Sequence, residues 1–105
     1  MIGRLRHRAT VARPVRTPDG GGGAETGWET VAAVWVSITA LSAAEKEAAG
    51  RLDGVATHRV VMRFRDDIRG GMRLTRGNRT FRLLASHDPD GSRRFLIVTA
   101  EEEGR

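Results

Sequence analysis

The chain has 105 residues, no cysteine and a formal net charge of +5 at pH 7. This length predicts one domain over residues 1–105 with a single modest core. The absence of cysteine excludes disulfides, thiolate metal sites and cysteine nucleophiles. Because no apolar run approaches the roughly 20 residues of a membrane helix, we expect no membrane segment. All of the 18 basic residues except Lys46 are arginine, and a basic chain fits either a nucleic acid or an acidic protein partner.

Residues 4–13 alternate between apolar and cationic side chains, which predicts a half-buried strand. Its two faces carry Leu5, His7, Ala9 and Val11 on the inside and Arg4, Arg6, Arg8 and Thr10 on the outside. Pro14 lacks a backbone N–H, so we expect strand pairing to end at this residue.

Four consecutive glycines, Gly20–Gly23, lie within the next stretch, residues 16–27. Consecutive glycines hold a regular strand or helix only at a large entropic cost, so we predict a flexible glycine loop over 18–27. A phosphate-binding loop is the functional alternative, but it needs a helix after the glycines and usually a lysine at its end. A strand-like segment without lysine follows here, which favours the hairpin loop.

Residues 28–41 form the longest β-branched stretch and predict a strand that is apolar on both faces. The face that we assign to the core carries Ala32, Val34, Val36 and Ile38. Trp35 lies on the other face. We expect it to pack under the helix that follows, and we prefer this to an exposed interface anchor.

Residues 42–50 predict a short helix with recognisable ends. Ser42 and Glu45 match a capping box, and Gly50 suits the left-handed position that ends a helix. Two alanine-rich turns are marginal alone, so the helix needs a surface to rest on. The helix belongs to an insertion, residues 41–56, that is too long for a tight hairpin.

The stretch 57–71 contains His58, Asp66 and Asp67 among several arginines, which raises the question of a catalytic or metal site. Over 57–65 the apolar residues have a period of two, with His58 and Phe64 on the inward face, so we predict an amphipathic strand. At about 3.3 Å per residue, His58 lies roughly 26 Å from Asp66 along that strand. The two residues therefore cannot share a site, and both aspartates fit the turn that ends the strand.

The remaining segments predict a meander of strands. Residues 72–75 and 80–86 flank a tight turn at Gly77-Asn78, and residues 88–93 predict a second turn. Residues 94–100 are apolar on both faces, which indicates a central strand. The fold class is therefore all-β: a small antiparallel β-barrel or sandwich of about six strands with one short inserted α-helix.

The residues able to carry chemistry form no recognisable pattern. The three histidines fall on different predicted strands or strand ends, without the spacing of a metal site. Both pairs of close carboxylates fall in predicted turns. These residues are His7, His58 and His87 and the pairs Asp66-Asp67 and Asp88/Asp90. We predict no catalytic residue, no metal site and no cofactor, and we predict that the chain is not an enzyme.

The arginines are the remaining signal, because several fall on outward strand faces. The basic interface candidates are Arg4, Arg6, Arg8, Arg59, Arg63, Arg65 and Arg82. Barrels that bind single-stranded nucleic acid interleave such residues with exposed aromatic side chains. The aromatic residues here alternate inward, so we do not expect bases to be read. Contact with a DNA backbone, or with acidic patches of a neighbouring subunit, stays open.

Five motifs in order resemble the bacteriophage head–tail connector proteins called head-closure or stopper proteins, a family that also serves phage-like gene transfer agents. The motifs are "GRLRHRATVARP", "GGGAETGWETVAAVWVSITALSAAE", "THRVVMRFR", "GMRL" and "DPDGSRRFLIV". The likeness covers residues 3–100. One departure is Ala12, where the family often has glutamine.

The resemblance implies a β-barrel that assembles as a homo-oligomeric ring in the neck of a phage or phage-like particle, after assembly in the bacterial cytoplasm. The ring lies between a portal/adaptor ring above and tail terminator or tail tube proteins below. It closes the channel on packaged DNA without sequence recognition and provides the tail docking surface. The resemblance also implies that residues 41–56 project toward the channel or the next subunit, with Glu45, Lys46, Glu47 and Arg51 as candidate contacts.

A nucleic-acid-binding small β-barrel of the oligonucleotide-binding type is the alternative function. Ring formation on a portal–adaptor complex supports the connector, whereas salt-sensitive binding of short single strands supports the alternative.

Overall fold

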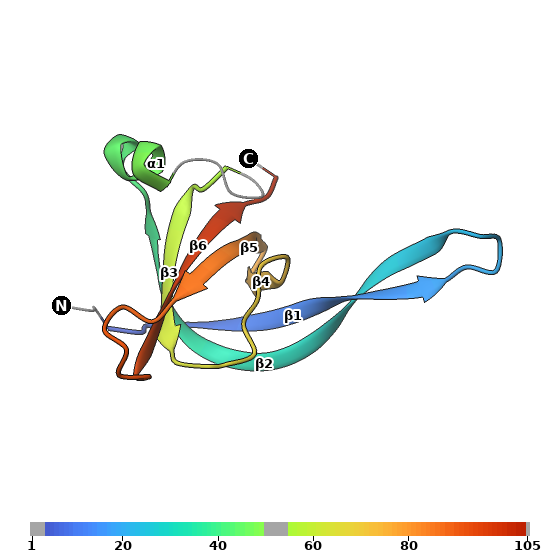
Figure 1. Ribbon diagram of the computed structural model, residues 1–105, viewed down its shortest axis with the longest axis horizontal. Helices are drawn as coiled ribbons and strands as arrows, with labels where there is room; N and C mark the ends of the chain where they lie inside the picture. Colours follow the sequence, from blue (N-terminus) through green and yellow to red (C-terminus); the bar gives the residue numbers. More distant parts are fainter. Residues whose placement is uncertain (1–3, 50–54, 105) are drawn as a thin grey trace.

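The computed structural model describes residues 4–49 and 55–104, which form six strands and one helix. The elements are β1 (His7–Pro18), β2 (Ala24–Ala40), α1 (Ala43–Ala49), β3 (His58–Arg63), β4 (Arg73–Arg76), β5 (Arg79–His87) and β6 (Phe95–Glu102). All neighbouring strands are antiparallel, and the order β1-β2-β3-β6-β5-β4 closes through a β1–β4 pairing (Figure 1). The predicted fold class, a small antiparallel barrel with one inserted helix, is confirmed.

The barrel interior is filled by alternate residues of its strands, as the period of two predicts. The largest fully buried side chains are Phe81, Met62, Leu74, Leu83, Val11, Val36, Val60 and Val98. None of the fully buried residues among those described is polar or charged. Phe81 is the largest fully buried side chain, so a mainly aliphatic core packs around one aromatic ring. Phe64 packs against this core from its margin and is half-buried.

The two predicted turns of the meander are present. Gly77 and Asn78 connect the paired residues Arg76 and Arg79, and Gly77 has the positive φ of 60° that such a turn requires. In the turn after β5, the Asp88 carboxylate accepts hydrogen bonds from backbone N–H groups, including that of Arg93 at 2.8 Å. β6 pairs with β3 on one side and β5 on the other, so the predicted central strand is confirmed.

β1 and β2 run far beyond the barrel wall as a two-stranded ribbon, which we call the arm and define as residues 13–29. The arm makes the molecule 51 Å long against 27 Å in the other two directions (Figure 1). The prediction that pairing stops at Pro14 is wrong, because Pro14 pairs with Trp28 and the ladder continues to Pro18 and Ala24. Beyond Ala12, β1 has no neighbour except β2. The outer edge of β1 is unpaired at this position, so the missing N–H of Pro14 costs no hydrogen bond there.

The predicted glycine loop over 18–27 is also shorter than expected, because only residues 19–23 lie outside the two strands. Asp19 organises this turn. Its Oδ1 accepts hydrogen bonds from the backbone N–H of Gly21 at 2.8 Å and of Gly23 at 3.2 Å. The mobility expected for residues 18–27 stays a prediction.

Replacing Phe81 with alanine should destabilise the barrel by about 3 kcal/mol or more, because the change opens a cavity in the middle of the core. Phe64→Ala is the matched control and should cost clearly less, since Phe64 is only half-buried. The measurement is urea denaturation of both variants beside the unsubstituted protein. Equal losses for the two phenylalanines would contradict this description of the core.

Candidate functional site

The insertion between β2 and β3 carries a helix that has no buried residue. The predicted capping box is confirmed: the N–H of Glu45 donates to Ser42 Oγ at 3.2 Å, and the N–H of Ser42 donates to Glu45 Oε1 at 3.0 Å. The N–H of Leu41 donates to the carbonyl of Thr57 at 3.0 Å and joins the two ends of the insertion. The helix stands at one end of the barrel (Figure 1). Gly50 and Arg51 lie outside the described residues.

Glu45 ties this helix to the barrel wall. Its Oε2 accepts a hydrogen bond from the Arg59 guanidinium on β3 at 2.6 Å, while its Oε1 holds the cap. The backbone N–H of Ser42 and the Arg59 guanidinium hold the pKa of Glu45 below its ordinary value. Of the candidate contacts of the insertion, Glu45 is therefore engaged within the molecule, whereas Lys46 and Glu47 are exposed.

Lowering the pH should loosen α1. Because the folded-state pKa of Glu45 lies below its unfolded value, the carboxylate contributes stability that is fully present above about pH 4.5 and is lost as the pH falls through the folded value. Hydrogen-exchange protection of the α1 amides, relative to that of β6, is the measurement. Glu45→Gln should remove this pH dependence, and Glu47→Gln should leave it unchanged. Protection of α1 that stays constant down to about pH 3 in the unsubstituted protein would contradict the role given to Glu45.

The basic interface candidates differ in their contacts, and three of them, Arg4, Arg63 and Arg65, line one pocket. Arg59 pairs with Glu45, and Arg65 forms two hydrogen bonds with Asp67, at 2.9 and 2.8 Å. The Arg65 hydrogen bonds hold the pKa of Asp67 below its ordinary value. Arg82 is half-buried on β5, opposite Glu101 of β6. The other four candidates, Arg4, Arg6, Arg8 and Arg63, are exposed and form no ion pair with a described residue.

Arginines stack on aromatic rings along the outer surface of the barrel. The Arg8 guanidinium lies 5.3 Å from the ring centre of Trp35, which is its register partner on β2. In the same way Arg63 lies 5.7 Å from the ring of Phe95, its partner on β6. Such cation–π pairs are worth about 0.5–1 kcal/mol at exposed sites. They keep the rings and the charges in fixed positions on the surface.

The predictions about the aromatic residues fail for both tryptophans. The sequence predicts that Trp35 packs under the helix and that the aromatic residues alternate inward, which holds for the buried Phe81. Instead, Trp35 is 50% exposed and Trp28 is 40% exposed. The reason is local: α1 begins three residues after β2 ends, so it stands beyond the end of the barrel and does not cover the outer face of β2 at Trp35 (Figure 1).

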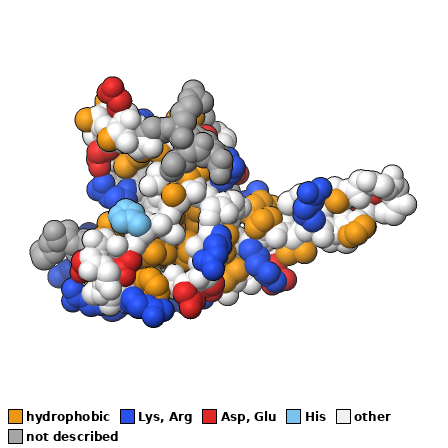
Figure 2. All heavy atoms as spheres, in the orientation of Figure 1, with side chains coloured by type: hydrophobic (Ala, Val, Ile, Leu, Met, Phe, Trp, Pro, Cys, Tyr) orange, Lys and Arg blue, Asp and Glu red, His pale blue; other side chains and the backbone are white. Residues whose placement is uncertain are grey.

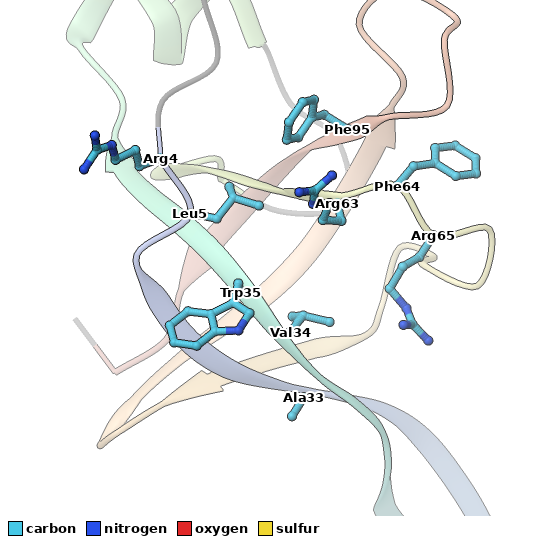
Figure 3. Close-up of a pocket in the computed structure, with 9 residues that line it drawn as sticks. All are labelled: Arg4, Leu5, Ala33, Val34, Trp35, Arg63, Phe64, Arg65 and Phe95. Carbon is cyan, nitrogen blue, oxygen red and sulfur yellow. The ribbon is translucent and has the colours of Figure 1, made fainter.

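Trp35 lines an open pocket of about 740 Å³ on the barrel surface (Figure 3). We call it the Trp35 pocket. Its residues come from the segment before β1, from β2, from the end of β3 and from the start of β6: Arg4, Leu5, Ala33, Val34, Trp35, Arg63, Phe64, Arg65 and Phe95. Apolar side chains thus stand beside arginines, and no carboxylate is among the described residues of the lining. Such a pocket suits a ligand that combines apolar groups with negative charge.

Trp28 stands at the base of the arm, where it meets Arg73 of β4. The Arg73 guanidinium lies 4.1 Å from the Trp28 ring centre, and its Nε is buried without a hydrogen-bond partner among the described residues. Its Nη2 lies 4.0 Å from a Glu103 carboxylate oxygen. Across the arm, Arg13 and Glu29 form an ion pair of 2.6 Å. These contacts hold the base of the arm against the barrel.

His58 lies in a half-buried cluster that joins three strands. Its Nδ1 lies 2.8 Å from Thr57 Oγ1, its Nε2 lies 3.8 Å from Glu102 Oε1, and its ring meets the Phe81 ring edge-on at 5.3 Å. Arg79 donates two hydrogen bonds to the Glu102 carboxylate, at 2.7 and 3.1 Å. These contacts link β3 to β5 and β6, which gives His58 a structural role.

The carboxylates of Asp88 and Asp90 serve a turn, as predicted, and Asp66 and Asp67 lie just after the end of β3. Asp67 pairs with Arg65, and the backbone carbonyl of Asp66 accepts a hydrogen bond from Arg69. The Ser92 hydroxyl and backbone N–H lower the pKa of Asp90 to about 2. Within residues 4–49 and 55–104, no three His, Asp or Glu side chains are placed to hold a metal ion together. Over the same ranges, no helix is long and apolar enough to cross a membrane.

The model of the phage head completion proteins matches residues 1–103. The chain belongs to this family. Head completion proteins are structural components of phage particles, so the chain has a structural role in a virion. No curated protein matches the chain.

Two solved structures share the fold of this head completion protein. The solution structure of protein SF1141 from Shigella flexneri 2a has 28% sequence identity and a TM-score of 0.78, and the match covers 99% of this chain and 97% of that chain. A chain in the virion of a native gene transfer agent particle has 25% identity and a TM-score of 0.70, with 96% of this chain and 97% of that chain covered.

Sequence reasoning missed three features of this head completion protein: the length of the arm, the Trp35 pocket and the Arg–aromatic pairs. The strand phase already placed Arg8 and Trp35 on outward faces. What the sequence lacked was the register that makes them neighbours. The pocket is likewise built from four separate segments, which only the closed barrel brings together.

Proposed function

We propose that this protein is a connector that forms a homo-oligomeric ring between the portal/adaptor and the tail, closes the DNA channel after packaging and provides the tail docking surface. The observation that carries the proposal is the family match over residues 1–103, together with the likeness to a chain of a gene transfer agent virion. In this proposal the whole chain, residues 1–105, is one head-closure domain. It is assembled in the bacterial cytoplasm, lies in the neck of the particle and has no enzymatic activity.

The insertion over residues 41–56 is the proposed gate. A gate has to move when DNA leaves, and elements with few buried contacts open at the lowest cost. α1 fits this need, because it has no buried residue and is held through its capping box and the Glu45–Arg59 ion pair. Exposed Lys46 and Glu47, together with Arg51, are its proposed contacts with the channel or the next subunit. Such closure needs no base-specific contact with the DNA.

The exposed arginines Arg4, Arg6, Arg8 and Arg63 are the proposed contacts with neighbouring proteins. Arginine presents a planar fork of donors that matches carboxylates and is favoured over lysine at interfaces. These side chains form no ion pair with a described residue, so carboxylates of a partner can pair with them without breaking existing bridges.

Nucleic-acid binding in the manner of oligonucleotide-binding barrels is the second candidate. The observation in its favour is the pair of exposed tryptophans beside arginines, Trp28 and Trp35. Base stacking needs an open ring face, and here arginines lie over both rings. We therefore favour the connector. Salt-sensitive binding of short single strands by the isolated protein would favour the alternative.

Deleting residues 43–51 and bridging the gap with a short Gly-Ser turn tests the gate. The thermal transition of the barrel should stay where it is, because no residue of α1 is buried. Particles assembled with this variant should leak DNA or lack tails. The measurements are a thermal melt of the purified variant, and DNA content and electron microscopy of the particles.

A replacement of the same residues by Gly-Ser sequence of equal length is the matched control, since it keeps the length and removes the helix. Leakage from the deletion alone would show that length closes the channel, and leakage from both would show that the helix does. If particles with the deletion keep their genomes and carry tails, the insertion is a surface loop and the gating role is withdrawn.

A further inference from the structure

The arm lacks the contacts that a ribbon of its length needs. Within residues 13–29, every residue except the half-buried Val15 is exposed. β2 pairs with β3 only from Val36 onward, and β1 pairs with β4 only up to Ala12, so both outer edges of the arm are open. A two-stranded ribbon alone is marginally stable in water, and open strand edges invite pairing with another chain. These features are typical of a ribbon that is stabilised by binding to a partner.

The outer part of the arm exposes apolar side chains on one face, and two acids, Asp19 and Glu25, lie at or near its tip. The register places Pro14 opposite Trp28 and Pro18 opposite Ala24, and alternation brings these pairs to the same face, with the Arg16–Thr26 pair between them (Figure 2 shows hydrophobic side chains exposed along the arm). Beyond the Arg13–Glu29 ion pair, residues 14–28 hold two acids, Asp19 and Glu25, and one base, Arg16, which gives a net charge of −1.

The Trp35 pocket is complementary to this outer arm. It is lined by apolar side chains, with Trp35 half-exposed beside them, and its charged residues are all arginines. Arg4 and Arg63 form no ion pair with a described residue. An arm with prolines and alanine on one face and carboxylates at its tip matches both the apolar and the basic part of the lining.

The arm of a molecule cannot fill the pocket of the same molecule. Leu5 of the pocket lies two residues before the start of β1, whereas Pro18 ends β1 at the tip of the arm. Thirteen residues of extended chain separate them, or roughly 40 Å at the rise of a strand. The N-terminal segment and the tip of the arm lie at opposite ends of the molecule (Figure 1). An arm that fills this pocket must therefore come from a second copy.

We propose that the arm of each subunit docks in the Trp35 pocket of the next copy of this chain. The proposal rests on the proposed ring and names the contact that builds it. An arm on one side and a pocket on the other make a head-to-tail contact. Such contacts close into a ring when the repeated rotation adds up to one full turn without a shift along the axis.

Thiol crosslinking tests this contact, because the chain has no cysteine of its own. The variant carries Ala24→Cys on the arm and Ala33→Cys in the pocket, both at exposed alanines. A short bismaleimide is added to the concentrated purified protein and, separately, to intact particles. The doubly substituted chain should give a ladder of dimers, trimers and higher species, whereas each single substitution should stop at the dimer, since one thiol per chain cannot link a third copy.

The matched control joins Ala24→Cys to Ala44→Cys on the exposed helix α1, and it should give no ladder. Adding Trp35→Ala to the arm–pocket variant should lower the ladder yield about tenfold or more, because an aromatic anchor is removed from the contact. A ladder from the control equal to that from the arm–pocket pair overturns the proposal.

Particles separate this contact from the connector role. Particles that contain the doubly substituted protein but give no ladder overturn the arm contact and leave the connector in place. If, in addition, a Trp35→Ala variant fails to enter particles, we would conclude that the Trp35 pocket binds another virion protein. A ladder from the purified protein, with no protein in the particles, supports the contact and contradicts the connector.

Discussion

The barrel is closed by three residue pairs between β1 and β4: Thr10 with Thr75, Val11 with Leu74 and Ala12 with Arg73. This short seam buries Val11 and Leu74 completely and completes the wall around Phe81. Because the seam ends at Ala12, the rest of β1 leaves the barrel with β2 and becomes the arm. A bulge at the same place adds Val31 to β2 between the partners of Val11 and Ala12. Bulges increase the local twist of a ribbon, so one junction both completes the core and sends the arm outward.

The arginines also have two roles: some stabilise the molecule through ion pairs, and others lie on its surface beside aromatic rings. Arg59, Arg65 and Arg79 pair with carboxylates of the chain, and Arg8 and Arg63 stack on aromatic rings. A guanidinium that stacks on a ring still has its N–H donors at the edge of its plane, so Arg8 and Arg63 can donate hydrogen bonds to a partner. A small barrel with an aliphatic core gains further stability by mass action when it binds partners. A modest core together with arginines on the surface suits a protein that works inside an assembly.

The strand pattern could be predicted from the sequence, because a period of two needs no knowledge of neighbours. The inward phase of Val60 and Met62, the capping box of Ser42 with Glu45 and the Gly77-Asn78 turn are local signals, and all three are present. The arm was missed because Pro14 breaks a ladder only where its N–H is needed, and the sequence does not show which edges are open.

The surface sites could not be predicted, since they depend on register and on closure of the barrel. The Glu45–Arg59 ion pair joins residues 14 positions apart across the insertion, and the Trp35 pocket combines four segments. Trp35 is exposed because α1 does not cover it. The sequence pattern of a helix predicts the helix but not its position relative to the barrel.

The central claim is that this barrel builds the neck ring of a particle, and an electron cryomicroscopy reconstruction of the neck tests it most directly. We expect a closed ring of barrels below the portal, with the insertion between β2 and β3 turned toward the channel and each arm lying across the Trp35 pocket of the next subunit. A neck without this barrel, or a single copy away from the channel, would contradict it.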